Sequence, residues 1–165
     1  MNKIVDLMNH LPNILIVDDI EENLFLLEVV MEKIKINLIR ANSGIEALEK
    51  TQGVDLALAI IDVKMPIMNG FELAKKLNEC RPDSKVPIIF ITANYGTDAT
   101  EGYESGAVDY IQKPFNSKIL LSKIIVFLNL FNQKQIIGRN AELLKESSDE
   151  LKKSIEQLHR LSKYT

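Results

Sequence analysis

Residues 56–70 read LALAIIDVKMPIMNG, and this stretch decides the fold that we predict. The apolar run 56–61 ends abruptly at Asp62. Apolar runs of this length, bounded by polar and turn residues, are typical of strands in a parallel sheet that is covered on both faces. Pro66 lacks a backbone donor and Asn69-Gly70 provides turn residues, so the chain leaves regular structure after the aspartate. We therefore place Asp62 at the carboxyl end of a central strand, where open α/β sheets bind ligands. For this segment alone, an aspartate that only marks the strand's end is an equally good interpretation.

Similar apolar runs alternate with helical patterns on both sides of this stretch. The predicted strands are Ile14–Val17, Asn37–Ala41, Leu56–Ile61, Val86–Ile91 and Val108–Ile111. The predicted helices are Glu21–Ile34, one capped by Ser43 with Glu46 completing a capping box, Phe71–Cys80, Thr97–Glu104 with Gly106 as its cap, and one that opens at Ser117. Such alternation predicts a parallel sheet with helices on both faces. The fold class that we predict is α/β, a doubly wound (βα)5 parallel sheet with flavodoxin-like strand order 2-1-3-4-5 and a C-terminal helical extension.

Size and composition limit the classes of function. The chain has 165 residues, enough for one domain of usual size and an appendage. Its net charge of -3 argues against a surface that coats nucleic acid or an anionic membrane. The single cysteine, Cys80, excludes an internal disulfide, and no apolar run approaches the roughly 20 residues that span a bilayer. We therefore expect a cytoplasmic protein with no direct contact to nucleic acid or membrane.

Polar residues follow four of the predicted strands. They are Asp18 and Asp19, then Asp62, Thr92 and Lys113. The carboxyl ends of parallel strands share one edge of the sheet, so we expect these side chains to converge on one pocket. Clustered carboxylates raise one another's pKa unless a cation intervenes, and their hard oxygens suit Mg²⁺. A hydroxyl and an ammonium at the same point suit the oxygens of a phosphoryl group. Each residue alone has an ordinary structural explanation; their joint placement indicates a site.

Four motifs carry a family resemblance. LIVDD (15–19), DVKMPIMNG (62–70), ITA (91–93) and DYIQKPF (109–115) resemble, in order and spacing, the receiver domain of two-component response regulators. The resemblance covers residues 13–131, and four motifs make it more specific than a single short pattern would be. It implies a phospho-accepting signalling domain rather than an enzyme that turns over a metabolite.

The resemblance assigns a role to each acidic residue. Asp62 would accept the phosphoryl group from the phosphohistidine of a histidine kinase or phosphotransfer protein. Asp19 and Asp62 would ligate Mg²⁺ directly, together with the backbone carbonyl of Lys64, and Asp18 would hold a metal-bound water. The chemistry agrees with these roles, because a carboxylate is a competent nucleophile and Mg²⁺ offsets the repulsion between an anionic nucleophile and an anionic donor.

The resemblance also assigns the residues that answer phosphorylation. Thr92 and Lys113 would contact the phosphoryl oxygens, and Tyr110 would change rotamer together with Thr92. Tyr110 on its own suits a core aromatic equally well. Phosphorylation would thereby switch the face formed by the fourth helix, fifth strand and fifth helix, and through it the C-terminal helix. In this family the peptide bond between Lys113 and Pro114 is often cis.

The chain divides into three predicted segments: an N-terminal arm (1–12), the receiver domain (13–131) and a helical tail or linker (132–165). In the tail, apolar residues recur every seven positions, as in one column of a coiled-coil heptad: Leu130, Ile137, Leu144, Leu151 and Leu158. The companion column is only half apolar: Phe127, Lys134, Ala141, Ser148, Ile155 and Ser162. Two interpretations stay open, a homodimer through this helix and a helix folded back on its own domain. Gly138 is a candidate break or hinge.

Other functions fit the sequence less well. A haloacid-type phosphatase would need an Asp-x-Asp pattern after the first strand, where this chain has adjacent aspartates. A flavin-binding domain would need a phosphate loop at the position of those aspartates. A receiver-like interaction domain that is not phosphorylated remains the alternative, although the chain keeps every site side chain of the motif. The chain ends inside the predicted helix, and no output-domain pattern follows the receiver motifs. We therefore expect the N-terminal part of a longer regulator or hybrid kinase, with any catalytic domain outside this chain; a complete single-domain regulator with a dimerising tail is the other interpretation.

Overall fold

The computed structural model describes residues 10–94 and 109–164. Four of the predicted features fall outside these residues: the helix Thr97–Glu104, its cap Gly106, the first residue of the last strand, Val108, and most of the arm 1–12. No helix in the described part of the chain has the length and apolar character needed to cross a membrane.

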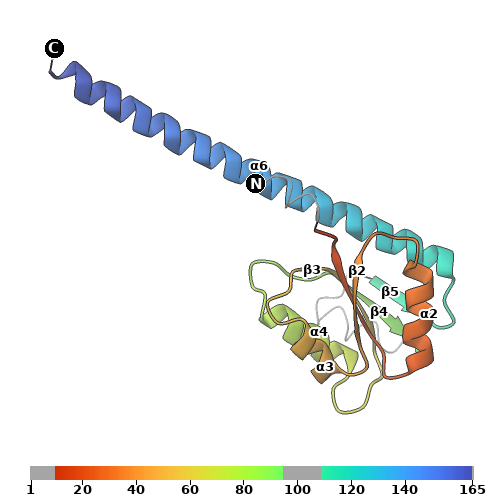
Figure 1. The fold of residues 1–165 in the computed structure, drawn as a ribbon. Coiled ribbons are helices and arrows are strands. Elements are labelled where there is room, and N and C mark those ends of the chain that lie inside the picture. Colours follow the sequence, from red (N-terminus) through yellow and green to blue (C-terminus); the bar gives the residue numbers. More distant parts are fainter. Residues whose placement is uncertain (1–9, 95–108, 165) are drawn as a thin grey trace. The chain divides into compact units, whose positions relative to one another are not determined.

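Five parallel strands form one sheet in the order β2-β1-β3-β4-β5 (Figure 1), which confirms the predicted strand order. The strands are β1 (Asn13–Val17), β2 (Asn37–Ala41), β3 (Leu56–Asp62), β4 (Ile88–Thr92) and β5 (Asp109–Gln112). Every residue of β3 and β4 is buried. The unbroken apolar runs therefore correspond to central strands that are covered on both faces.

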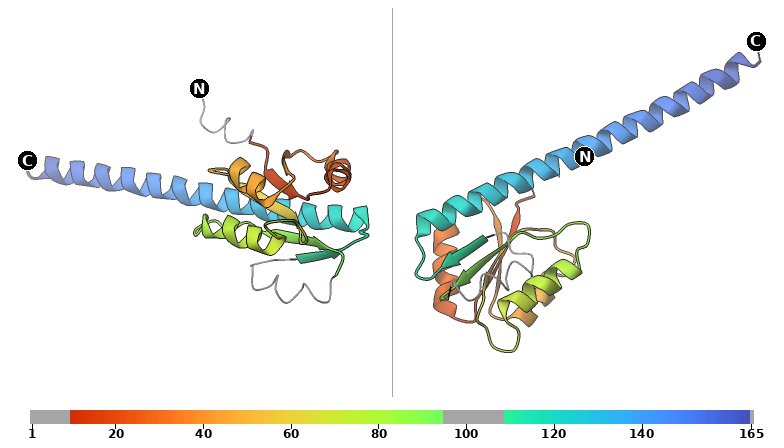
Figure 2. Two further views of the ribbon diagram at one scale, coloured as in Figure 1. Left: turned by 90° about the horizontal axis from the view of Figure 1, so that it is seen from below. Right: turned by 180° about the vertical axis from the view of Figure 1, so that it is seen from behind.

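Helices cover both faces of this sheet (Figures 1 and 2). They are α2 (Glu21–Met31), α3 (Gly44–Lys50), α4 (Gly70–Glu79) and α6 (Ser117–Ser162). Helix α2 and the first turns of α6 lie on one face, and α3 and α4 lie on the other. Leu120, Ile124 and Leu128 are the buried residues of α6. All buried apolar side chains in the described residues thus belong to a doubly wound α/β domain.

Several element boundaries differ from the prediction by one to three residues, and two of these differences have a local reason. Helix α2 ends at Met31 rather than Ile34, because the Ile34 amide donates to the Met31 carbonyl over three residues and tightens the chain into a turn. Strand β4 begins at Ile88, since Pro87 has no N–H to offer a neighbouring strand. Helix α4 begins at Gly70, one residue before the predicted start, and ends at Glu79.

Helix α3 begins with a modified capping box. The predicted cap forms, since the Glu46 amide donates to Ser43 Oγ at 3.1 Å. The return contact shifts by one residue: Glu46 Oε2 accepts from the amide of Asn42, not from that of Ser43. Ala47 is buried and Leu48 packs against the core, as the helical pattern indicated. Side-chain acceptors thus satisfy the exposed amides at this helix start.

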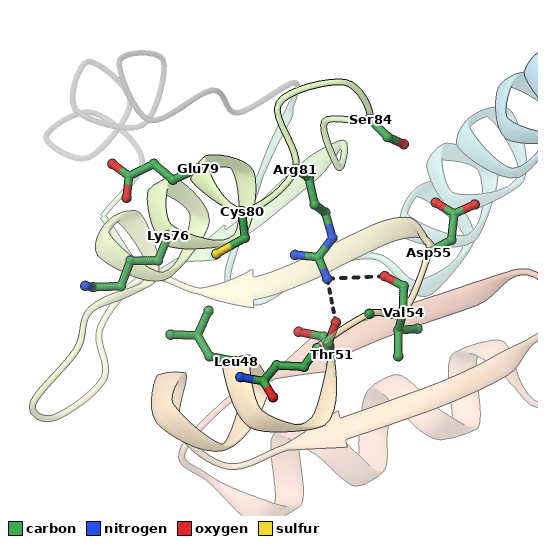
Figure 3. Close-up of a pocket in the computed structure, with 11 residues that line it drawn as sticks. Leu48, Thr51, Val54, Asp55, Lys76, Glu79, Cys80, Arg81 and Ser84 are labelled. Atoms are coloured by element: carbon green, nitrogen blue, oxygen red, sulfur yellow. Dashed lines mark hydrogen bonds between the residues drawn. The ribbon is translucent and has the colours of Figure 1, made fainter.

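One guanidinium connects the ends of α3 and α4 at the amino-terminal edge of the sheet (Figure 3). Arg81 donates from Nη2 to the carbonyls of Thr51 (2.6 Å) and Val54 (3.2 Å), and from Nη1 to the carbonyl of Leu77 (2.9 Å). These contacts tie the ends of the two helices together, because Thr51 follows α3 directly and Leu77 lies in the last turn of α4. A pocket of about 600 Å³ borders Arg81. It lies at the opposite edge from Asp62, so it has no part in the chemistry at the strand ends.

The second compact unit of the chain begins at Asn129 and consists of the later part of α6. The helix continues through Gly138 to Ser162, so the predicted break at Gly138 is wrong. A carbon atom added at Gly138 would meet no atom within 4 Å, which shows that close packing does not require a glycine there. The helix therefore continues through Gly138 despite the roughly 1 kcal/mol that a glycine costs in a helix interior.

Candidate functional site

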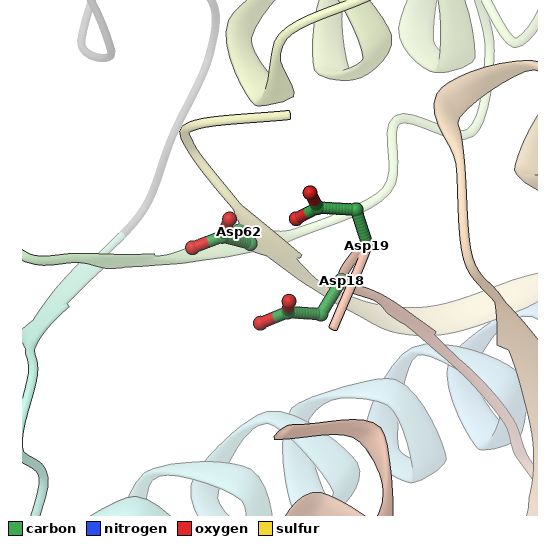
Figure 4. A group of neighbouring side chains, drawn as sticks. All are labelled: Asp18, Asp19 and Asp62. Atoms are coloured by element: carbon green, nitrogen blue, oxygen red, sulfur yellow. The ribbon is translucent and has the colours of Figure 1, made fainter. Parts of the chain in front are cut away.

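Three carboxylates meet at the carboxyl ends of β1 and β3 (Figure 4). Asp18 and Asp19 follow β1, and Asp62 is the last residue of β3. These strands are neighbours, with Val17 paired to Ile61, so the three side chains are brought together by sheet register. One oxygen from each carboxylate lies within 4.8 Å of the others. Asp18 is 2% exposed and Asp62 7% exposed, whereas Asp19 is open to solvent.

The start of helix α2 fixes the Asp18 carboxylate. Its Oδ1 accepts from the Ile20 amide at 2.9 Å, and its Oδ2 accepts from Asn23 Nδ2 at 3.0 Å. Asn23 was not among the site residues predicted from the sequence. The available signal was a polar residue in the first turn of a helix that directly follows an aspartate pair. Asn23 is a positioning residue, since it contacts Asp18 and is not itself a member of the acidic cluster.

Lys113 brings an ammonium group into the acidic cluster. Its Nζ lies 2.9 Å from Asp62 Oδ1 and 3.3 Å from Asp18 Oδ2. The residue follows β5, and its amide donates to the Thr92 carbonyl at 2.8 Å, which continues the pairing of β4 and β5. The Lys113–Pro114 peptide bond is cis. Two of the predicted site carboxylates therefore share one lysine that comes from a distant part of the sequence.

Burial and charge act against each other at this cluster. Desolvation raises the pKa of the Asp62 carboxyl, and although the hydrogen bond from Lys113 opposes this, the negative charge of Asp18 adds to the rise, leaving the pKa above its ordinary value. Desolvation lowers the pKa of the Lys113 ammonium, but its hydrogen bond to Asp62 and the two carboxylate charges outweigh burial and raise that pKa. Burial thus favours the neutral Asp62 carboxyl even though an ammonium group contacts it.

The shape of the loop after Asp62 depends on a glycine without room for a side chain. A Cβ at Gly70 would lie 2.4 Å from the Asp62 carbonyl oxygen. The Gly70 amide donates to the Val63 carbonyl at 2.9 Å, which holds the start of α4 against the end of β3. Asn69 caps this helix through the Glu72 amide at 2.9 Å. The Asn-Gly pair therefore serves a helix cap and a close backbone approach, beyond the turn that the sequence predicted.

Thr92 and Tyr110 lie on the neighbouring strands β4 and β5. Thr92 is buried at the end of β4, and its Oγ1 accepts from the Asn94 amide at 3.0 Å. Tyr110 is buried, and its ring centroid lies 5.5 Å from that of Phe90. Thr92 pairs with Gln112, and Phe90 pairs with Tyr110. Thr92 and Tyr110 are therefore offset by two residues and lie on the same face of the sheet. Their roles as phosphoryl contact and switch stay predictions, and much of the predicted switching face lies in 95–108, outside the described residues.

Lys64 lies beside the exposed carboxylate of the cluster, and Asn94 contacts Lys64. Asp19 and Lys64 line one open pocket of about 520 Å³. The Asn94 amide is best oriented with its oxygen toward Lys64 Nζ, 2.6 Å away. The loops after β3 and β4 are thereby joined by polar side chains. The predicted role of the Lys64 carbonyl as a metal ligand remains a prediction.

The donor set fits magnesium. The cluster offers carboxylate oxygens only, with no sulfur or imidazole among its members. Hard oxygen ligands suit Mg²⁺, which is commonly held by one or two carboxylates and several waters. Asp19 is exposed, which leaves room for the water ligands of such an ion. Asp18 and Asp62 are buried and supply negative charge at fixed positions.

Comparison with known proteins identifies the family. The family model of the response regulator receiver domain matches residues 14–125. The transcriptional regulatory protein SrrA of Staphylococcus aureus is 36% identical over 116 residues, which are 70% of this chain and 47% of SrrA. The probable transcriptional regulator ycf29 of Pyropia yezoensis is 43% identical over 89 residues, which are 53% of this chain and 40% of that protein. The chain thus spans about half the length of these curated relatives or less.

Solved structures agree with this assignment. A CheY-like receiver domain protein from Methanospirillum hungatei has a TM-score of 0.68 at 31% identity, covering 75% of this chain and 98% of that one. Chemotaxis protein CheY4 of Vibrio cholerae has a TM-score of 0.66 at 29% identity, covering 71% and 98%. The BeF3-activated DrrB receiver domain has a TM-score of 0.65 at 27% identity, covering 72% and 98%. The chain belongs to the response regulator receiver domain family, and its function is phospho-accepting signal transduction in two-component signalling.

Proposed function

We propose that Asp62 is the phosphoryl acceptor and that Asp18, Asp19 and Asp62 hold Mg²⁺ beside it. The observation that carries this proposal is the position of Asp62, buried at the end of the central strand with two carboxylates within 4.8 Å and Lys113 Nζ at 2.9 Å. A carboxylate so placed is a fixed nucleophile at a sheet edge that is open to a partner. We propose that the physiological donor is a phosphohistidine on a histidine kinase or phosphotransfer protein, as the membership in the receiver domain family suggests.

The transfer needs positioning and charge neutralisation more than acid–base chemistry. A bond forms between an Asp62 carboxylate oxygen and phosphorus, and the phosphorus–nitrogen bond of the donor breaks with its electron pair left on the imidazole. The Lys113 ammonium can exchange a carboxylate contact for a phosphoryl oxygen, and the Thr92 hydroxyl offers a second contact. Bound Mg²⁺ would supply positive charge between the anionic nucleophile and the anionic donor.

The experiment that tests this proposal uses a small phosphodonor. Purified chain is incubated with acetyl phosphate and Mg²⁺, reduced with borohydride to trap the acyl phosphate, and mapped by peptide mass spectrometry. We expect one modified residue, Asp62, and no modification when the metal is chelated. Modification of another aspartate, or none at all with the donor in excess, would show that the site is wrongly assigned.

Asp19→Asn is expected to weaken Mg²⁺ binding by at least about tenfold, or about 1.4 kcal/mol. The change removes one anionic ligand while keeping the side-chain shape, and the fold should stay intact because repulsion within the cluster falls. Isothermal titration calorimetry measures the affinity. Glu22→Gln is the matched control, since Glu22 is an exposed carboxylate close in sequence but outside the cluster. Equal affinity for Asp19→Asn and the control would place the metal elsewhere.

We also propose that two copies of the chain pair through α6. The support is the apolar column of the predicted heptad, whose five members each keep more than half of their surface exposed in this helix: Leu130, Ile137, Leu144, Leu151 and Leu158.

The domain limits 13–131 and 132–165 and the cytoplasmic location stay predictions from the sequence.

A further inference from the structure

The later part of α6 presents a seam of regularly spaced apolar side chains to solvent. Five residues spaced by seven lie on it, with exposed fractions between 54% and 72%: Leu130, Ile137, Leu144, Leu151 and Leu158. A strict spacing of seven follows a left-handed supercoil better than it follows a straight helix or the surface of a globular domain. The seam is therefore best buried by another helix that has the same supercoil pitch.

The neighbouring columns fix how such a helix would pack. If the seam is taken as the d column, the a column holds Ala141, Ile155 and small or polar residues. If the seam is taken as the a column, the d column would hold Gln133, Asn140, Ser147, Ser154 and Leu161, of which Leu161 alone is apolar. The first assignment buries more apolar surface. Ile155 at an a position followed by Leu158 at d also favours two strands over three or four.

We propose that α6 forms a parallel, in-register, two-stranded coiled coil with a second copy of this chain, with these five residues as the d column. The inference rests on the pairing of two copies proposed above and adds its orientation and register. A two-fold interface of this kind is self-complementary, so every d residue packs against its own counterpart.

The flanking charges decide the orientation. The e column carries Lys145, Lys152 and His159, and the g column opposite it carries uncharged Asn140 and Ser147. In a parallel pair, e residues face g residues of the partner, so each lysine meets an amide or a hydroxyl. In an antiparallel pair, e residues face e residues, so lysine would meet lysine. Like charges directly opposed are destabilising, and the parallel arrangement avoids them.

The a column sets the strength and the register. Lys134 at an a position is the kind of polar residue that specifies register and number of strands at a cost in stability. Ser148 adds a second weak layer near the middle of the seam. The pairing is therefore weaker than that of a fully apolar zipper, and it depends strongly on each d residue.

Analytical ultracentrifugation of the full chain tests the seam. We expect a concentration-dependent dimer, and Leu144→Asp should raise its dissociation constant by at least about 100-fold, since a carboxylate would be buried in the seam. Leu143→Asp is the matched control, because it makes the same change at an exposed neighbouring residue outside the seam. A monomeric wild-type chain, or equal loss in both variants, would overturn the coiled coil.

Oxidative cross-linking tests the orientation in a Cys80→Ser background. In a parallel, in-register pair Leu151→Cys cross-links to itself, whereas in an antiparallel pair centred on Leu144 it lies near Ile137 of the other copy. We therefore expect Leu151→Cys alone to form a covalent dimer and Glu146→Cys, on the outer side of the helix, to form none. A dimer that cross-links only between Leu151→Cys and Ile137→Cys chains would overturn the parallel arrangement. Phosphoryl labelling of Asp62 in the Leu144→Asp chain separates these outcomes from a failure of the acceptor proposal.

Discussion

Asp62→Asn is expected to reduce phosphoryl incorporation from acetyl phosphate to background. An amide is a poor nucleophile and cannot form the acyl phosphate, while its size and hydrogen-bonding atoms keep the end of β3 unchanged. Asp83→Asn, which changes an exposed aspartate beyond α4, should label like the wild type. Intact mass spectrometry in the presence of Mg²⁺ measures both variants. Equal labelling of wild type and Asp62→Asn would mean that another residue accepts the group.

The same variant has a predicted effect on stability that shows whether the cluster is strained by charge. The pKa of Asp62 is raised in the folded chain above the ordinary value of 3.8, so the folded state binds the proton more tightly than the unfolded state. The stability that this protonation provides is fully present below pH 3.8 and is lost as pH rises through the folded pKa. Without Mg²⁺, Asp62→Asn should thus be more stable than wild type at neutral pH, with the difference vanishing in acid. Urea unfolding across this range checks the sign.

The sheet was predictable because its strands are buried on both faces. Strand β3 required an unbroken apolar run, and its end at Asp62 coincided with the first residue that could not be buried without partners. Helix ends were harder to predict. Leu24, Leu27 and Met31 are the buried residues of α2, but apolar residues continue past Met31 into the turn, so periodicity did not mark the end.

The strand-end rule predicted which side chains approach one another, but not their contacts. It placed Asp18, Asp62 and Lys113 at one edge, and the structure brings Lys113 into direct contact with both carboxylates. It could not predict that one lysine serves two carboxylates, since that depends on side-chain direction. The contact of Asn23 with Asp18 depends on the entry angle of α2. The close approach of Gly70 to the Asp62 carbonyl is a tertiary fact that no local pattern contains.

Lys113→Met is expected to lower the free energy of unfolding by about 2–3 kcal/mol at neutral pH without Mg²⁺. Removing one partner of a buried ion pair typically costs about 3–5 kcal/mol, and the 27% exposure of the Lys113 side chain reduces that cost through solvent screening. The midpoint of thermal unfolding should fall by roughly 5–10 °C. Methionine keeps most of the length of the side chain, so the loss reports the charge. Lys118→Met is the control, since Lys118 is an exposed lysine at the start of α6.

The dependence on pH and metal separates lost charge from lost packing. Without the ammonium, the hydrogen bond and charge that lower the pKa of Asp62 disappear, so this pKa rises further and the carboxyl keeps its proton to higher pH. The loss of unfolding free energy caused by Lys113→Met should therefore be small in acid, where Asp62 is protonated in both chains. It should grow as pH rises through the folded pKa that Asp62 has in the wild type. Added Mg²⁺ should restore part of the stability, because it supplies the missing positive charge.

The double variant Lys113→Met, Asp62→Asn closes a double-mutant cycle, which measures the coupling free energy between the two side chains. With position 62 neutral, loss of the lysine leaves only Asp18 without its counter-charge, so the cost of Lys113→Met should fall by about half or more. Urea unfolding of all four chains at neutral pH gives the coupling free energy. A cost that is the same in the wild-type and Asp62→Asn backgrounds, and equal at acid and neutral pH, would mean that Lys113 stabilises the fold by packing alone.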